Sequence, residues 1–130
     1  RATVAGRVYT HPVDLILGHN DIVHPDLVVI LASRLSIYTD DGFIEEPPDV
    51  LIEVISPRTR GLDRVRKMAL YIRSRVPEYW VADPFRRELV VNVLKGEKYV
   101  PIEVDANGVI ASPAISGLRV DPAEVFARFD

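Results

Sequence analysis

The most restrictive feature of this chain is an apolar segment with one carboxylate in its middle. The segment runs from Glu46 to Pro57, with Pro47 and Pro48 near its start. Prolines cannot extend a β-ladder and β-branched residues favour strands, so the pattern predicts a buried strand. Glu53 lies within that strand. An ionised carboxylate is costly to bury unless a metal, a cation or hydrogen bonds compensate, so Glu53 is a candidate functional residue.

A second segment, His24 to Leu31, has the same layout. Pro25 and Asp26 precede a run of apolar residues, which predicts another buried strand with an acid at its start. Side chains of like parity on neighbouring strands share a face of the sheet, so we expect Asp26 and Glu53 to converge. Two carboxylates of this kind suit Mg²⁺ or Mn²⁺ as the shared ion.

The charge of the chain is unevenly distributed. Its formal net charge is −3, yet residues 56–75 carry seven basic residues against one acid, Asp63. Such a basic segment beside Glu53 is suited to contact phosphates. A solvated amphipathic helix is the alternative reading of the same composition.

We predict a helix from Asp63 to Arg75, which Val76-Pro77 brings to an end. Four apolar residues at helical spacing are expected to face the core: Val65, Ala69, Ile72 and Val76. Lys67 lies on the other side, which it shares with Leu70 and Tyr71 at i+3 and i+4. That side is therefore not purely polar, and Lys67 is a candidate to point into a cleft.

The remaining chain favours strands and tight turns. We expect strands over Gly6–Thr10, Val13–Leu17 and Glu78–Pro84, a turn at Gly18–Asp21, a helical turn near Ala32–Leu35, a hairpin of Glu88–Leu94 with Lys98–Val104 around Gly96, a further hairpin at Asn107-Gly108, and a terminal helix from Asp121-Pro122. Tyr79 and Trp80 are expected to pack in the core. This order predicts a mixed sheet with helices packed on it.

Composition limits the possible functions. A chain of 130 residues with 48 % hydrophobic residues suits one domain with a real core. No apolar run is long enough for a membrane span and no signal peptide is recognisable, so we expect a soluble, cytoplasmic protein. The absence of cysteine excludes thiolate metal sites and cysteine nucleophiles. Any metal here is expected to be a hard cation bound by oxygen.

Three segments carry a family resemblance: HPDLVVI, the run PPDVLIEVISPRTRGLDRVRKMALYIRSRVPEYWVADP, and the closing ISGLRVDPAEVF. They resemble the Uma-two family of bacterial proteins, which are labelled as restriction endonucleases and form a branch of the PD-(D/E)XK nuclease superfamily. The resemblance extends over nearly the whole chain. It implies an α/β fold, with a restriction-endonuclease-like mixed β-sheet flanked by α-helices, and Mg²⁺-dependent hydrolysis of DNA.

The resemblance also implies roles for particular residues. The Pro-Asp pair of the superfamily falls on Pro25 and Asp26, its second acid falls on Glu53, and the carbonyl of Val54 becomes a further metal ligand. Ile55 stands where the superfamily has its lysine, so Lys67 from the following helix is expected to replace it. Family members also begin with a helical segment that carries another glutamate. We expect the present sequence to be part of such a longer chain, with an incomplete metal site.

The leading hypothesis is a metal-dependent endonuclease. In it Asp26, Glu53 and the Val54 carbonyl bind Mg²⁺ or Mn²⁺, and Lys67 assists the attacking water. The phosphate backbone of DNA would be held by Arg58, Arg60 and Arg64. DNA is the expected partner, a homodimer is a further option, and a membrane is not an expected partner.

Each assignment has a structural alternative. Asp26 would then cap backbone amides, Glu53 would pair with an arginine, and Lys67 would be a solvated helix residue. Asp49 shares parity with Glu53 but better suits a strand start. If these alternatives hold, the chain is a catalytically inactive module of the nuclease fold that binds nucleic acid or a protein partner.

Overall fold

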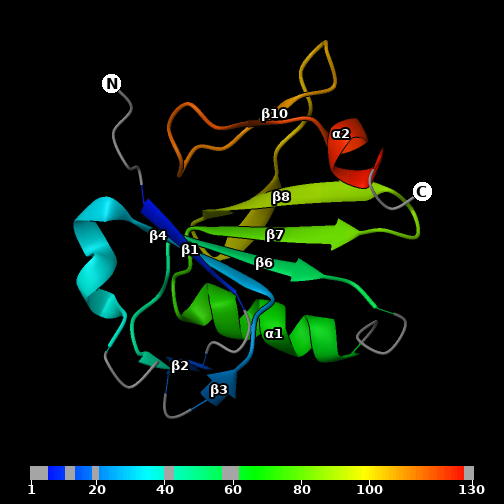
Figure 1. Cartoon of the computed structure of the whole chain (residues 1–130). Coiled ribbons are helices and arrows are strands. Elements are labelled where there is room, and N and C mark those ends of the chain that lie inside the picture. The colour runs from blue at the N-terminus through cyan, green and yellow to red at the C-terminus, as the bar shows by residue number, and fades with distance from the viewer. Residues whose placement is uncertain (1–5, 11–13, 19–20, 40–42, 57–61, 128–130) are drawn as a thin grey trace.

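The computed structural model describes residues 6–10, 14–18, 21–39, 43–56 and 62–127. Its main sheet has six strands in the order β1-β4-β6-β7-β8-β9 (Figure 1). Their bounds are Gly6–Thr10 (β1), Leu27–Leu31 (β4), Val50–Val54 (β6), Glu78–Asp83 (β7), Glu88–Lys95 (β8) and Lys98–Pro101 (β9). β6 and β7 are parallel and the other neighbouring pairs are antiparallel. The predicted mixed sheet is confirmed.

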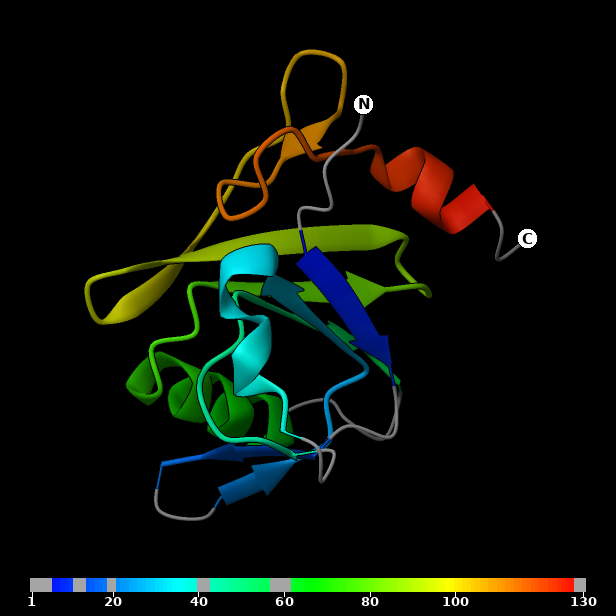
Figure 2. The ribbon, with the colours of Figure 1, turned by 60° about the vertical axis from the view of Figure 1, so that its left-hand side comes forward.

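Two layers cover the main sheet. Helix α1 (Leu62–Arg73) follows β6 and packs on one face together with the short helix η1 (Ala32–Ile37) and a small sheet of β3, β2 and β5 (Figure 2). That small sheet consists of Asp21–Val23 (β3), Asp14–Leu17 (β2) and Phe43–Ile44 (β5). The opposite face meets β10 (Ile110–Ala111), β11 (Arg119–Val120) and α2 (Pro122–Ala127). Within the described ranges, no helix is long and apolar enough to cross a membrane.

Strand alternation decides which side chains enter which layer. On β6, Leu51 belongs to the core under α1, whereas Val50 belongs to the core on the opposite face. On β7, Tyr79 belongs to the core under α1 and Trp80 to the core on the opposite face. Because side chains two residues apart in a strand point to one face, Glu53 lies on the α1 face with Leu51.

Helix α1 is rotated relative to the sequence prediction. Leu70 and Tyr71 are buried, but Val65 is 65 % exposed, so the predicted core stripe was wrong at its first position. Tyr71 adds a large ring and a hydroxyl to the buried side of the helix, and the sheet beneath it presents a carboxylate that needs donors. The apolar spacing had predicted that this side of the helix, which includes Lys67, faces away from the core.

Several element bounds also differ from the prediction. Of the turn expected at Gly18–Asp21, His19 and Asn20 lie outside the described residues, and Asp21 already belongs to strand β3, which pairs with β2. Helix α1 ends at Arg73 because Arg75 adopts a left-handed backbone conformation with φ of 62°, which stops the helix before the expected residue. Strand β9 ends at Pro101 rather than Val104, since proline lacks the N–H needed to extend the ladder.

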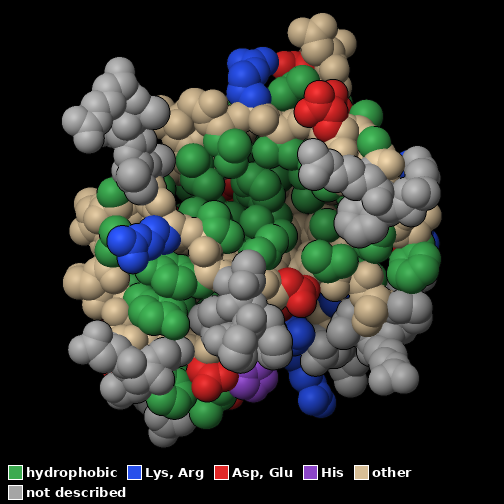
Figure 3. Space-filling model, viewed as in Figure 1, with side chains coloured by type: hydrophobic (Ala, Val, Ile, Leu, Met, Phe, Trp, Pro, Cys, Tyr) green, Lys and Arg blue, Asp and Glu red, His purple; other side chains and the backbone are tan. Residues whose placement is uncertain are grey.

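The sheet face opposite α1 is only partly covered. Hydrophobic side chains gather at the centre of the face shown in Figure 3. An apolar groove of about 400 Å³ lies here between the strands β1, β4 and β6 and the segment around Ile115 and Leu118. Trp80 lines this groove and belongs to the core on the face opposite α1. The prediction that it packs in the core is confirmed.

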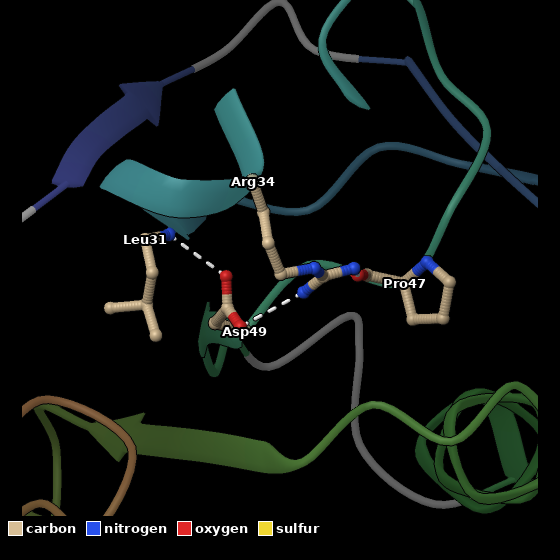
Figure 4. Close-up of polar contacts among 4 residues, drawn as sticks. All are labelled: Leu31, Arg34, Pro47 and Asp49. Atoms are coloured by element: carbon tan, nitrogen blue, oxygen red, sulfur yellow. Dashed lines mark hydrogen bonds and ion pairs between the residues drawn. The ribbon is translucent and has the colours of Figure 1, made fainter. Parts of the chain in front are cut away.

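Asp49 joins three elements at the start of β6 (Figure 4). Asp49 is 7 % exposed, and its Oδ2 accepts a hydrogen bond of 2.8 Å from the Leu31 N–H. Arg34 Nη1 donates to Oδ1 over 2.9 Å, and Arg34 Nη2 donates to the Pro47 carbonyl over 2.6 Å. Asp49 therefore has the strand-start role, and fixes the end of β4 and η1 against β6.

We expect Asp49→Ala to lower the free energy of unfolding by about 2–3 kcal/mol, because it leaves the Leu31 N–H and the Arg34 guanidinium without their acceptor. Urea unfolding followed by the fluorescence of the single tryptophan, Trp80, measures this change. Glu46→Ala is the matched control, since Glu46 is an exposed acid three residues earlier. Equal unfolding curves for the two variants would show that the Asp49 contacts contribute little.

Candidate active site

Glu53 is buried on β6 and is compensated by three donors. The residue is only 9 % exposed. Its Oε1 accepts a hydrogen bond of 2.6 Å from the Tyr71 hydroxyl, and its Oε2 accepts one of 3.0 Å from the Tyr79 hydroxyl. Lys67 Nζ lies 3.6 Å from Oε1. The donors come from α1 and from the parallel neighbour β7, so helix and sheet meet at this carboxylate.

Asp26 lies immediately before β4 and beside the backbone of β6. The β4–β6 register pairs Leu27 with Ile52, so one further step places Asp26 opposite Glu53. The next step places Pro25 opposite Val54, beyond the end of the β4–β6 ladder. The Asp26 Oδ2 instead accepts the Val54 N–H over 2.7 Å. The prediction that Asp26 and Glu53 occupy neighbouring strands is confirmed.

The Val54 carbonyl belongs to the same edge of β6. In a strand the N–H and C=O of one residue point to the same side. The Val54 N–H points toward Asp26, whereas the next N–H, of Ile55, donates to Ala82 on the β7 side over 2.8 Å. The Val54 carbonyl is therefore directed toward the β4 side, and the residue is 41 % exposed. An oxygen donor is available beside the two carboxylates.

Lys67 supplies the ammonium group near these oxygens. Ile55, at the position where the resemblance would place a lysine, is buried in the core under α1. The cation that reaches Glu53 comes instead from the next helix, as the sequence predicted for Lys67. Among the described residues, Glu53 is paired with this lysine rather than with an arginine. The structural alternative for Asp26 is also present in part, because its carboxylate does cap a backbone amide.

Of the three arginines predicted to hold phosphate, Arg64 lies within the described residues and Arg58 and Arg60 lie outside them. Arg64 is half-buried in the first turns of α1. Its positive charge lowers the pKa of the Tyr79 hydroxyl, so the two groups lie within electrostatic range of each other. Arg64 therefore lies near the Glu53 cluster, which comprises Glu53, Lys67, Tyr71 and Tyr79.

The two tyrosines act as fixed donors. Burial raises the pKa of Tyr71 well above its ordinary value, and the charge and hydrogen bond of Glu53 raise it further. The pKa of Tyr79 is raised by burial and by Glu53 as well, and the nearby Arg64 lowers it by a smaller amount. Both hydroxyls therefore stay protonated and donate to Glu53 in its charged form.

Sequence reasoning missed the polar role of Tyr71 and Tyr79. Tyr79 was assigned to core packing alone, and its ring does pack edge-on against Tyr71 with centroids 5.1 Å apart. Two signals were available in the sequence. Tyr71 is four residues after Lys67, on the same side of the helix, and a buried tyrosine hydroxyl usually needs a partner.

With this geometry defined, similarity to known proteins becomes informative. Residues 1–123 match the family described as "Uma2: Putative restriction endonuclease". The chain belongs to the Uma2 family. This is the family that the HPDLVVI and PPDVLIEV segments resembled. No match was found among curated proteins.

The fold has a solved counterpart. The crystal structure of "a putative nuclease belonging to DUF820" from Anabaena variabilis ATCC 29413 superimposes with a TM-score of 0.72 at 21 % sequence identity. The match covers 95 % of the present chain and 69 % of that chain. The restriction-endonuclease-like α/β fold expected from the sequence is thus confirmed, and the Uma2 chain is nuclease-like in both family and fold.

The tyrosine contacts predict a specific loss of stability at alkaline pH. The unfolded chain ionises its tyrosines near the ordinary pKa of 10.0, whereas the folded chain keeps Tyr71 and Tyr79 protonated. Their contribution is complete below that pH and is lost as the pH rises above it, at about 1.4 kcal/mol per pH unit for each group. Tyr71→Phe should therefore show a shallower decline in unfolding free energy above pH 10 than the wild type.

Urea unfolding at a series of pH values measures these slopes. Tyr9→Phe is the matched control, because it removes one hydroxyl from the stacked Tyr9–Tyr38 pair instead. Identical slopes for Tyr71→Phe and Tyr9→Phe would contradict the assignment of the Tyr71 hydroxyl as a buried donor to Glu53.

Proposed function

We propose that this Uma2 chain is a Mg²⁺-dependent endonuclease that hydrolyses phosphodiester bonds of DNA. The observation that carries the proposal is that β4 and β6 are neighbours in a register that carries Asp26 to a position opposite Glu53, with Lys67 Nζ 3.6 Å from Glu53 Oε1. The family description and the nuclease fold of the Anabaena protein support the reaction class. The nature of the ion, the choice of DNA and the roles of the residues are inferences from site chemistry.

The donor set fits a hard divalent cation. Asp26, Glu53 and the Val54 carbonyl offer oxygen only, which suits Mg²⁺ or Mn²⁺. Each carboxylate oxygen has more than one acceptor site, so the bonds from Tyr71 and Tyr79 leave capacity for an ion. Among the described residues, no three acidic or histidine side chains gather at one point. Two carboxylates are nevertheless typical for Mg²⁺, which completes its shell with water and substrate phosphate oxygens.

The chain's own residues would then prepare the hydrolysis. A bound Mg²⁺ would polarise a phosphate oxygen and so make the phosphorus more open to attack. Tyr71 and Tyr79 hold Glu53 in one orientation, and the Val54 N–H does the same for Asp26. Lys67 lies where it can orient a water and balance negative charge that builds on the phosphate. The water oxygen would bond to phosphorus and give up a proton to solvent, while the P–O bond to the sugar breaks and the leaving sugar oxygen takes up a proton from solvent.

Arginines near the cluster would position the DNA backbone. Arg64 is the described member of the predicted set, and its charge lowers the pKa of Tyr79. Arg58 and Arg60 keep their proposed role as phosphate contacts on the basis of their charge and sequence position alone.

Removal of either carboxylate charge should abolish cleavage. Asp26→Asn keeps an oxygen that can accept the Val54 N–H, so it tests the charge of Asp26 while it preserves the backbone contact. We expect Asp26→Asn and Glu53→Gln each to reduce the Mg²⁺-dependent cleavage rate of plasmid DNA by at least about 100-fold, and to abolish Mn²⁺ uptake in calorimetry. Glu88→Gln, at an exposed acid of β8, is the control. Full activity in a folded Asp26→Asn variant would remove the metal-site assignment.

Lys67 should be separable from metal binding. Lys67→Met removes the ammonium but keeps a similar unbranched side chain against the core. We expect the cleavage rate to fall by about 100-fold while Mn²⁺ affinity is kept or increased, because a cation next to Glu53 has been removed. A variant that loses Mn²⁺ binding and activity together would identify Lys67 as a structural residue.

The second candidate is a binding module of the same fold without catalysis. One observation favours it: both oxygens of Glu53 already accept tyrosine hydroxyls, so its buried charge is compensated without an ion. In that case Mn²⁺ calorimetry would show no uptake that depends on Asp26, and DNA binding would be unchanged by divalent metal. Mn²⁺ calorimetry on the wild-type and Asp26→Asn chains, together with DNA binding with and without divalent metal, therefore distinguishes the candidates.

A further inference from the structure

A groove of about 670 Å³ runs between strand β3 and helix α1 and borders the candidate active site. The strand contributes Ile22 and Val23, His24 follows it, and the helix contributes Arg66, Leu70 and Arg73. Lys67, the partner of Glu53, also lines it. A molecule in this groove would therefore lie next to the reacting groups.

The helix side of the groove presents positive charge at two points. Arg66 and Arg73 are exposed and seven residues apart, so both lie on one stripe of α1 about 10 Å apart along its axis. One acid, Asp21, lies at the groove on the strand side. Two spaced guanidinium groups on one side suit successive phosphates of a nucleic-acid strand better than a single small anion.

The rest of the groove lining is apolar. Ile22 is 54 % exposed there, and Val23 and Leu70 continue the apolar surface between the strand and the helix. Double-stranded DNA turns its phosphates outward and keeps its bases stacked inside, so a duplex would cover the arginines but not this apolar lining. A single strand can place its phosphates on the arginines and turn its bases or sugars toward the apolar side chains.

The groove continues beyond Arg73 into a second hollow of about 260 Å³. The two hollows share Asp21, Leu70 and Arg73, and the second one reaches Ser74. The Ser74 hydroxyl is buried and has no hydrogen-bond partner among the described residues.

We infer that this groove binds the single DNA strand next to the scissile phosphate. Arg66 and Arg73 contact phosphates of that strand, while Ile22, Val23 and Leu70 contact its bases or sugars. That the strand leads toward Lys67 rests on the proposed nuclease function. The preferred substrate is then single-stranded DNA, or the single-stranded flap of a branched DNA, rather than a duplex.

Binding without divalent metal tests the groove separately from catalysis. Fluorescence anisotropy in EDTA would compare a labelled oligothymidylate of about 12 nucleotides with a duplex of equal length. We expect the wild-type chain to bind the single strand more tightly. The Arg66→Ala/Arg73→Ala double variant should lose about tenfold in affinity for it, and the slope of log affinity against log salt should fall by about 1.4, which corresponds to two lost phosphate contacts.

Arg86→Ala/Arg119→Ala is the matched control, because it removes two exposed arginines outside the groove and should behave like the wild type. Equal or tighter binding of the duplex by the wild type, or equal binding by the two double variants, would overturn the inference. If the wild type binds as expected but Mg²⁺ gives no cleavage, the proposed chemistry fails and the groove stands. If Mg²⁺-dependent cleavage occurs while the Arg66/Arg73 variant binds single strands normally, the groove alone fails.

Discussion

The structure depends on how the carboxylate of Glu53 is held inside the protein. A buried charge without partners would cost more than a domain of this size can easily offset. Tyr79 from the neighbouring strand and Tyr71 and Lys67 from α1 provide the compensating donors. This requirement explains why α1 turns its Tyr71 side toward the sheet and leaves Val65 in solvent.

The contacts that satisfy this requirement also form the candidate active site. Protonated tyrosines can only donate to Glu53, so they keep its oxygens oriented without neutralising the charge. The β4–β6 ladder ends before Asp26, and the Asp26 carboxylate takes the place of a main-chain acceptor for the Val54 N–H. Capping the Val54 amide and the proposed metal binding are thus compatible roles for Asp26. The hydrogen bond to the backbone also holds the carboxylate in one place on the β4 side of β6. Lys67 lines the groove along α1, so the groove proposed for the DNA strand and the proposed site share a residue.

Most of the secondary structure was predictable because its signals are local. Prolines and β-branched runs marked β4 and β6, and Asp121-Pro122 marked the start of α2. The parity of Asp26 and Glu53 predicted a shared face if the strands are neighbours, and the structure confirms that β4 and β6 are neighbours. The orientation of α1 was not predictable from spacing, because the stripes of Val65 and of Lys67 overlap on a short helix and both contain apolar residues. Strand β3 was missed because its three residues acquire their conformation by pairing with β2.

The sequence by itself determined which segments become strands and helices, and it made Glu53 conspicuous as a charge in an apolar run. Only the tertiary structure decided which groups meet that charge. Tyr71 and Tyr79 are 18 and 26 residues from Glu53, and Asp26 is 28 residues from the amide that it caps. The physical reason is that propensity and capping act over a few neighbouring residues, whereas these contacts exist only after the sheet register and the rotation of α1 are fixed by packing of the whole core.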